Sequence, residues 1–172
     1  MFVFNGARAL KFATAVVLAL GATACAKNAA DDASIAGAAG GGYGRGGAAT
    51  PGSQQDFVVN VGDRVFFESD STELSSTAQA TLDKQARWLQ QYNRYSFTVE
   101  GHADERGTRE YNFALGARRA EVTKEYLAAK GIAASRIKTI SYGKERPVAV
   151  CNDISCWSQN RRAVTVLSGG QS

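Results

Sequence analysis

The residues best suited to bind a ligand lie between residues 99 and 120, which read VEGHADERGTREYNFALGARRA. A loop entering a predicted helix carries the acid Asp104. On the helix, Asn112, Leu115 and Arg119 are spaced i, i+3 and i+7, so they share one face. A carboxylate pairs with an ammonium group, and a guanidinium forks onto a carboxylate. The segment therefore suits a ligand that carries both charges.

Each of these residues also has a purely structural interpretation. Asp104 could cap the helix that follows, because a helix start leaves amides unpaired. Arg119 could be a solvated helix residue, as we expect for Arg118, since helix neighbours point about 100° apart. His102 is the single histidine, so a metal site is not expected. We expect His102 to border the site or to form a hydrogen bond within the fold.

The sequence supports an enzymatic function less well than it supports ligand binding without catalysis. A glycosidase needs two carboxylates across a cleft, one with a raised pKa, but Asp104 and Glu105 are adjacent in a polar loop beside arginines, which would not raise a pKa. A cysteine nucleophile would require His102 as its base, but Cys151 and Cys156 are better explained as a pair. The glycine-rich run GGGYGRGG follows no predicted strand, which argues against a phosphate loop. We expect a non-enzymatic binding protein without a cofactor.

The pattern around these residues predicts an α+β domain. Helices are expected from Ser75 or Ser76 to Tyr92 and from Thr108 to Lys130, with Gly131 as the stop; a short one is expected over 155–161. Strands are expected over residues 64–67, 95–101, 137–142 and 162–167. The order is β-α-β-α-β-(α)-β, a sandwich with helices packed on a small mixed sheet. The long helix is predicted to bury one apolar stripe made of Phe113, Gly116, Ala117, Ala120 and Leu127.

The N-terminus has the order of an export signal. Arg8 and Lys11 precede an apolar run over residues 12–20, and small residues follow up to Cys25. This arrangement is typical of a secretory signal, and the run is shorter than the ~20 residues that cross a bilayer. We therefore predict a signal peptide over residues 1–24; the alternative is a buried core helix.

Composition divides the rest of the 172-residue chain. Ten of the eighteen glycines lie in residues 1–52, and a segment so poor in large apolar residues cannot offset the entropy of ordering. We predict a disordered tether over residues 25–55, a folded domain over 56–168 and a tail over 169–172. The domain holds sixteen Lys/Arg and fourteen Asp/Glu, which argues against nucleic acid as its partner.

The three cysteines divide into one and two. Cys25 would be a free thiol after plain cleavage, which an oxidising compartment would not leave unreacted. It resembles the lipobox cysteine of bacterial lipoproteins, although Ala22 stands where that pattern has leucine. Lipidation of Cys25 is therefore expected, and multiple acyl chains anchor stably. Cys151 and Cys156 are expected to form a disulfide in an exported protein; the alternative is two reduced, buried thiols.

Four separated motifs resemble the OmpA-like peptidoglycan-binding domains, and most closely their peptidoglycan-associated lipoproteins. They read RVFFESDSTELSSTAQATLDKQARWL, GHADERGTREYNFALGARRA, ISYGKERPV and SQNRRAVTV. They occur in the family order over about residues 56–167. The resemblance implies an OmpA-like fold and noncovalent binding of peptidoglycan.

The resemblance also implies roles for single residues. In the family, a loop Asp and a helix Arg hold the two ends of diaminopimelate in the peptidoglycan stem peptide, and these positions match Asp104 and Arg119. Asn112 and Leu115 match further contact positions. The turn after the first strand matches at Ser69 and Asp70, where the family has an aromatic residue before the Asp; an apolar contact is therefore missing at Ser69.

For the cell, the resemblance implies a lipid anchor in the outer membrane, facing the periplasm, and by family analogy Ala26 favours that destination. It further implies membership of the Tol-Pal system, with TolB as a protein partner competing for the same face, and a role in envelope integrity and cell division. The rivals are an unlipidated periplasmic OmpA-like module and a cell-wall hydrolase.

Overall fold

The structure of the protein is a computed structural model that describes residues 49–169. The predicted signal peptide, Cys25 and most of the predicted tether lie outside the described residues. So do the last three residues of the predicted tail. None of the helices within 49–169 has the length and apolar character needed to cross a membrane.

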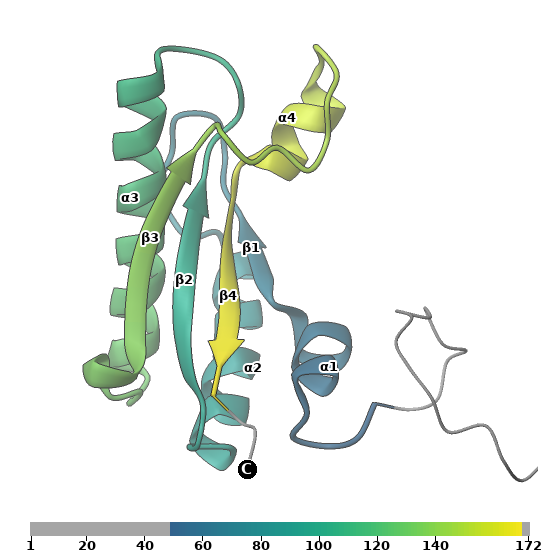
Figure 1. Cartoon of the computed structure of the whole chain (residues 1–172), viewed down its shortest axis with the longest axis vertical. Coiled ribbons are helices and arrows are strands. Elements are labelled where there is room, and N and C mark those ends of the chain that lie inside the picture. Colours follow the sequence, from purple (N-terminus) through teal and green to yellow (C-terminus); the bar gives the residue numbers. More distant parts are fainter. Residues whose placement is uncertain (1–48, 170–172) are drawn as a thin grey trace, which may run out of the picture. The chain divides into compact units, whose positions relative to one another are not determined.

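A four-stranded mixed sheet forms the centre of the domain (Figure 1). Its strands are β1 (Arg64–Phe66), β2 (Ser96–His102), β3 (Ile137–Gly143) and β4 (Arg162–Ser168), in the spatial order β1-β4-β2-β3. Strand β2 pairs in parallel with β3 and antiparallel with β4, which also pairs antiparallel with β1. The predicted α+β class and mixed sheet are confirmed, with strand ends within two residues of the prediction.

Two long helices lie behind the sheet in the view of Figure 1. They are α2 (Ser76–Gln91) and α3 (Arg109–Ala129). Both begin at the predicted caps, because the Ser75 and Thr108 side chains accept hydrogen bonds from helix amides. The short α4 (Ile154–Asn160) precedes β4. Helices and sheet bury a core that includes Phe97, Val99, Leu82 and Leu127.

The packed structure begins earlier than the predicted boundary at residue 56. The short α1 (Gln54–Asp56) leads into a π-helical segment, Phe57–Gly62. The Gly52 carbonyl accepts hydrogen bonds of 2.8 Å from both Tyr95 and Arg94, and Asp56 accepts one of 2.8 Å from the Trp88 indole. Residues 52–55 therefore belong to the domain rather than to the tether. Their polar composition did not indicate this, because they pack on aromatic side chains distant in sequence.

The buried face of α3 differs from the predicted apolar stripe. Phe113 is 57% exposed and Ala117 is exposed, so both predictions are wrong. Asn112 and Arg119 take the interior positions instead, with 2% and 0% exposure. A polar side chain can occupy the interior when its hydrogen bonds are made there, as described below for both residues.

Glycines let α3 approach β2 closely. A Cβ atom at Gly101 would lie 1.8 Å from the carbonyl oxygen of Gly116, and one at Gly116 would lie 2.5 Å from the Ser141 hydroxyl. Only glycine permits such backbone contact. The contact fixes the helix carrying Arg119 against the strand that leads to Asp104.

Candidate functional site

Asp104 follows the carboxyl end of β2 and is held by two arginines. The residue is buried, with 7% exposure. Arg106 donates from Nε to Oδ1 at 3.1 Å and from Nη2 to Oδ2 at 2.7 Å. Arg161 Nη1 lies 3.4 Å from Oδ2 and is itself buried, with its Nε donating to the Phe67 carbonyl. The acid is therefore the centre of a charged cluster.

The cluster determines the protonation of this acid. Burial alone would raise the pKa of Asp104, but hydrogen bonds from the side chain and backbone of Arg106 outweigh it, and the pKa lies below its ordinary value. Asp104 is therefore an anion at neutral pH. A general acid of a glycosidase needs the opposite shift, so the acid is suited to binding a cation.

Arg106 also joins Asp104 to the turn after β1. Its Nη2 donates to the Ser69 hydroxyl at 2.9 Å. The next residue, Asp70, has a left-handed backbone with φ of 54°, which Asp tolerates better than most residues. The Tyr111 hydroxyl on α3 lies 3.2 Å from Asp70 Oδ1. Two predicted site residues of this turn thus face the Asp104 loop and the start of α3.

Arg119 is fully buried beneath the same turn. Its guanidinium donates to the carbonyls of Glu68, Ser71 and His102, at 2.9–3.0 Å. Burial, together with the nearby charge of Arg161, lowers its pKa to about 10, so it remains charged at neutral pH. Three of its five N–H groups are used, and with 0% exposure the side chain is covered by the turn in this structure. The structure gives Arg119 a structural role; its predicted contact with a ligand stays a prediction.

Asn112 and Leu115 lie behind the loop. The Asn112 amide donates to the Arg106 carbonyl at 2.7 Å and so holds the loop backbone. Leu115 is 3% exposed, which leaves its side chain little surface to offer a ligand. Their direct contact with a ligand stays a prediction.

His102 is not hydrogen-bonded through its ring. It is 2% exposed, and among residues 49–169 neither ring nitrogen has a hydrogen-bond partner. Glu100 Oε2 is 3.5 Å from Nε2 but does not make a hydrogen bond. Burial, with the charges of Arg162 and Arg146, lowers its pKa to about 4. The expected hydrogen bond within the fold is made by the backbone carbonyl of His102, which accepts from Arg119, and not by the ring.

Two further residues shape the loop and were not singled out in the sequence. Lys144 Nζ donates to the carbonyls of Glu105 and Gly107 and so closes the loop from the β3 side. The Trp157 indole donates to Glu105 Oε1, and its ring faces Arg106 at 4.2 Å from the guanidinium carbon. Lys144 belongs to the ISYGKERPV motif and Trp157 immediately precedes SQNRRAVTV, but nothing local in the sequence links either residue to the Asp104 loop.

A disulfide fixes the segment that carries Trp157. Cys151 and Cys156 are joined, with their Cα atoms 5.6 Å apart, which confirms the predicted pairing. The bond closes the turn into α4, and Trp157 is the next residue. The cross-link therefore restrains the helix that places an indole beside the Asp104 loop.

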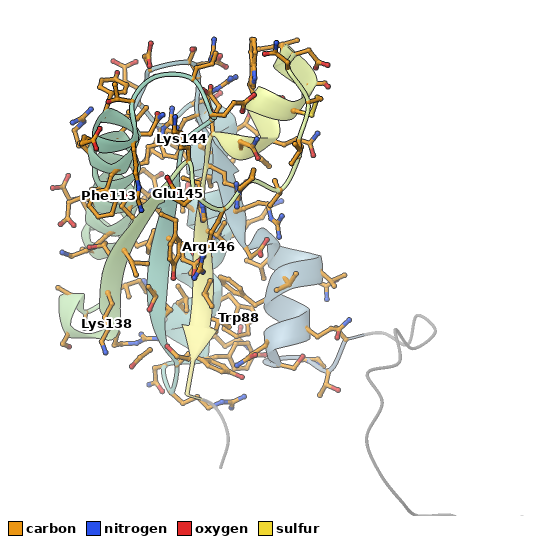
Figure 2. The ribbon with its side chains drawn as sticks, turned by 45° about the horizontal axis from the view of Figure 1, so that its top comes forward. Trp88, Phe113, Lys138, Lys144, Glu145 and Arg146 are labelled. Atoms are coloured by element: carbon orange, nitrogen blue, oxygen red, sulfur yellow. A yellow bond between two sulfur atoms is a disulfide. The ribbon has the colours of Figure 1, made fainter. Side chains whose placement is uncertain are left out.

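A cavity of about 590 Å³ opens beside the loop, at the start of α3 and the end of β3. Figure 2 shows Phe113, Lys144 and Glu145, which line it, together at this end of the sheet. Its rim carries an ion pair of 3.2 Å between Arg109 and Glu145. Among the described residues 49–169, no group of three or more His, Cys, Asp or Glu side chains is placed to hold a metal ion.

Comparison with known proteins agrees with the fold and the motifs. The model of the OmpA family matches residues 66–161. The chain is 64% identical to the "Peptidoglycan-associated lipoprotein" of Rhizobium meliloti (strain 1021) over 93% of this chain and 88% of that protein. It is 42% identical to the protein of the same name from Pseudomonas aeruginosa, over 88% and 93% of the two chains.

Solved structures extend the comparison. The crystal structure of the peptidoglycan-associated lipoprotein from Burkholderia pseudomallei matches with a TM-score of 0.63 and 35% identity, covering 66% of this chain and 98% of that one. The C-terminal domain of Helicobacter pylori MotB matches with a TM-score of 0.59 at 22% identity, covering 63% and 85%, and so shares the fold. The chain belongs to the OmpA family, among its peptidoglycan-associated lipoproteins.

Proposed function

We propose that the protein binds peptidoglycan noncovalently and is anchored in the outer membrane through a lipidated Cys25, facing the periplasm. The observation that carries the proposal is that an ionised, buried Asp104 and a buried Arg119 lie at the same turn, residues 68–71: Arg106 joins Asp104 to it, and Arg119 donates to its carbonyls. The names of the relatives support the peptidoglycan association.

The ligand we propose is the diaminopimelate residue of the stem peptide. The far end of diaminopimelate bears an ammonium and a carboxylate on one carbon. Asp104 would supply the anion for the ammonium, and Arg119 would supply the guanidinium for the carboxylate once the turn over residues 68–71 that covers it moves aside. Ser69 and Asp70 lie on the exposed side of the same site and would contact the peptide backbone.

In the cell, we propose that this contact links the outer membrane to the wall as part of the Tol-Pal system and supports envelope integrity and cell division. TolB is the proposed protein partner, and it would compete with peptidoglycan for the face that carries the Asp104 loop. Competition is tested by adding TolB to wall-bound protein: release into the supernatant is expected, and undiminished binding at saturating TolB would contradict it.

Co-sedimentation with purified cell-wall sacculi tests the binding itself. Asp104→Ala is expected to abolish sedimentation, because the ligand ammonium loses its only carboxylate in the buried part of the site. Glu110→Ala is the matched control, since Glu110 is an exposed acid at the start of α3. Sedimentation of Asp104→Ala at the wild-type level would remove the acid from the proposed site.

Two measurements distinguish the proposed function from its two alternatives, an unlipidated module and a cell-wall hydrolase. Metabolic labelling with a fatty acid is expected to mark Cys25, and an unlabelled Cys25→Ser variant is the control. Absence of label on the wild-type chain would favour an unlipidated module. Soluble muropeptides released from sacculi by the purified protein would favour a hydrolase, whereas the lowered pKa of Asp104 favours none being released.

A further inference from the structure

The carboxylate proposed to receive the ligand ammonium is already occupied. Both Asp104 oxygens accept from the Arg106 guanidinium, and Oδ1 also accepts from the Arg106 backbone amide at 3.2 Å. Arg161 takes a further position on Oδ2. With 7% of the residue exposed, there is no room for an ammonium group beside both arginines.

The two arginines differ in their freedom to leave. The Arg161 side chain is 5% exposed and is fixed through its Nε to the Phe67 carbonyl. The Arg106 side chain is 42% exposed, and its remaining side-chain partner is the exposed hydroxyl of Ser69. Displacing Arg106 therefore exposes a charge to water at little cost, whereas displacing Arg161 would unpair a buried carbonyl.

The Arg106 guanidinium contacts the Trp157 ring while it is paired with Asp104. The Trp157 ring is 4.2 Å from the guanidinium carbon, a cation–π distance, and the Glu105 carboxylate accepts a hydrogen bond from the same indole. An arginine released from Asp104 can thus stay over the indole and next to Glu105. The disulfide between Cys151 and Cys156 restrains the helix that carries Trp157.

From this geometry we propose that Arg106 occupies the position of the ligand cation: the ammonium of the stem peptide displaces Arg106 from Asp104, and Trp157 keeps hold of the displaced guanidinium. The proposal rests on the proposed peptidoglycan site and deepens it. It makes Arg106 and Trp157 specificity-determining residues, because a ligand without a cation cannot displace Arg106 and meets a closed site.

The charge of the site supports this order of events. While Arg106 is paired with Asp104, the carboxylate faces the guanidinium groups of Arg106 and Arg161. Arg119 lies close enough to interact with the same carboxylate electrostatically. Once Arg106 has moved away, the carboxylate regains a site for one cation while Arg119 keeps its own positive charge. The opened site is therefore matched to a zwitterion.

Calorimetric titration of the full chain in detergent tests the proposal. The probes are a soluble stem tripeptide with diaminopimelate at its third position and the same tripeptide with the side-chain amine acetylated. Arg106→Ala is expected to bind the free-amine peptide about fivefold more tightly, since a partly exposed ion pair no longer has to be broken. Its affinity for the acetylated peptide is expected to be unchanged from wild type. Arg109→Ala is the control, an arginine that is 73% exposed and pairs with Glu145 instead.

A double-mutant cycle tests whether Trp157 holds the displaced guanidinium of Arg106. Trp157→Ala is expected to weaken binding of the free-amine peptide about twofold to threefold when Arg106 is present, because the released guanidinium depends on the indole more than the paired one does, and to have no effect in the Arg106→Ala background. Equal effects in both backgrounds would remove Trp157 from the proposal. Unchanged or weaker binding by Arg106→Ala would overturn the displacement itself.

An Asp104→Ala arm keeps the two proposals distinguishable. If Asp104→Ala loses the free-amine peptide while Arg106→Ala gains nothing, the displacement fails and the peptidoglycan site stands. If Asp104→Ala binds as wild type does, the site itself is wrong.

Discussion

Replacing Arg119 by alanine should damage both binding and stability. The guanidinium is fully buried and donates to three backbone carbonyls, those of Glu68, Ser71 and His102. It also lies over the Phe67 ring, at 5.2 Å. These contacts tie the turn after β1 and the end of β2 to the middle of α3, so the variant loses a connection between three elements.

The size of the loss follows from two opposing contributions. Hydrogen bonds from a charged group contribute roughly 2 kcal/mol each, or about 6 kcal/mol for three. Burying the charge, which is the main reason that the pKa of Arg119 falls to about 10, offsets about 3 kcal/mol of that. The expected loss of unfolding free energy is therefore about 3 kcal/mol, which is large for a single substitution.

Urea unfolding followed by circular dichroism measures this loss. The matched control is Arg118→Ala, the exposed neighbour on the same helix, whose effect should stay within ~0.5 kcal/mol. Arg119→Ala with the same urea midpoint as Arg118→Ala would refute the structural role. Sacculus sedimentation of Arg119→Ala has to be measured where the variant is still folded, because a loss of binding could otherwise come from unfolding.

Three further predictions concern the frame of the site. The pKa of His102 is lowered to about 4 in the folded chain, so between pH 6.5 and 4 the imidazole is protonated in the unfolded chain but not in the folded one. The folded state should therefore keep its full stability above pH 6.5 and lose about 3 kcal/mol as the pH falls toward 4. His102→Gln should remove that slope in urea titrations, and parallel losses in both proteins would contradict it. Gly101→Ala places a methyl group 1.8 Å from the Gly116 carbonyl and should cost about 3 kcal/mol; a wild-type melting temperature would count against the close contact. Reducing the disulfide of Cys151 and Cys156 should lower stability by less than the ~3 kcal/mol of a fifteen-residue loop, measured as a shift in melting temperature with and without reductant; two free thiols in oxidised material would disprove the bond.

Much of the fold could be predicted because its signals are local. The caps Ser75 and Thr108 and the alternation of Phe97 and Val99 each depend on a few neighbouring residues, and they marked elements that the structure contains. The start of the domain could not be found in this way. Residues 52–56 are polar, and their packing depends on Trp88 and Tyr95, about forty residues further along the chain.

The candidate site was harder to predict for a related reason. Arg119 and Asn112 looked like residues of a polar helix face, and only the three-dimensional structure shows that backbone carbonyls satisfy them in the interior. Phe113, an apolar residue at helical spacing, is exposed instead. Pairs such as Glu105 and Trp157 are separated by 52 residues, so no spacing in the sequence indicates that they meet.

The place where the chain enters the domain has a mechanical consequence. Gly52 is bonded to Tyr95 at the beginning of β2, and Asp104 follows the end of that seven-residue strand, about 23 Å away at the usual rise. Figure 2 likewise shows Trp88 and Lys144 toward opposite ends of the sheet. A pull between the proposed N-terminal anchor and a ligand held at Asp104 would first load the hydrogen bonds of Gly52 and then β1, which pairs with β4. Tension along the strand axis loads the β1–β4 hydrogen bonds together as shear, rather than peeling them one by one, so the domain should resist pulling along its strands far better than pulling across them.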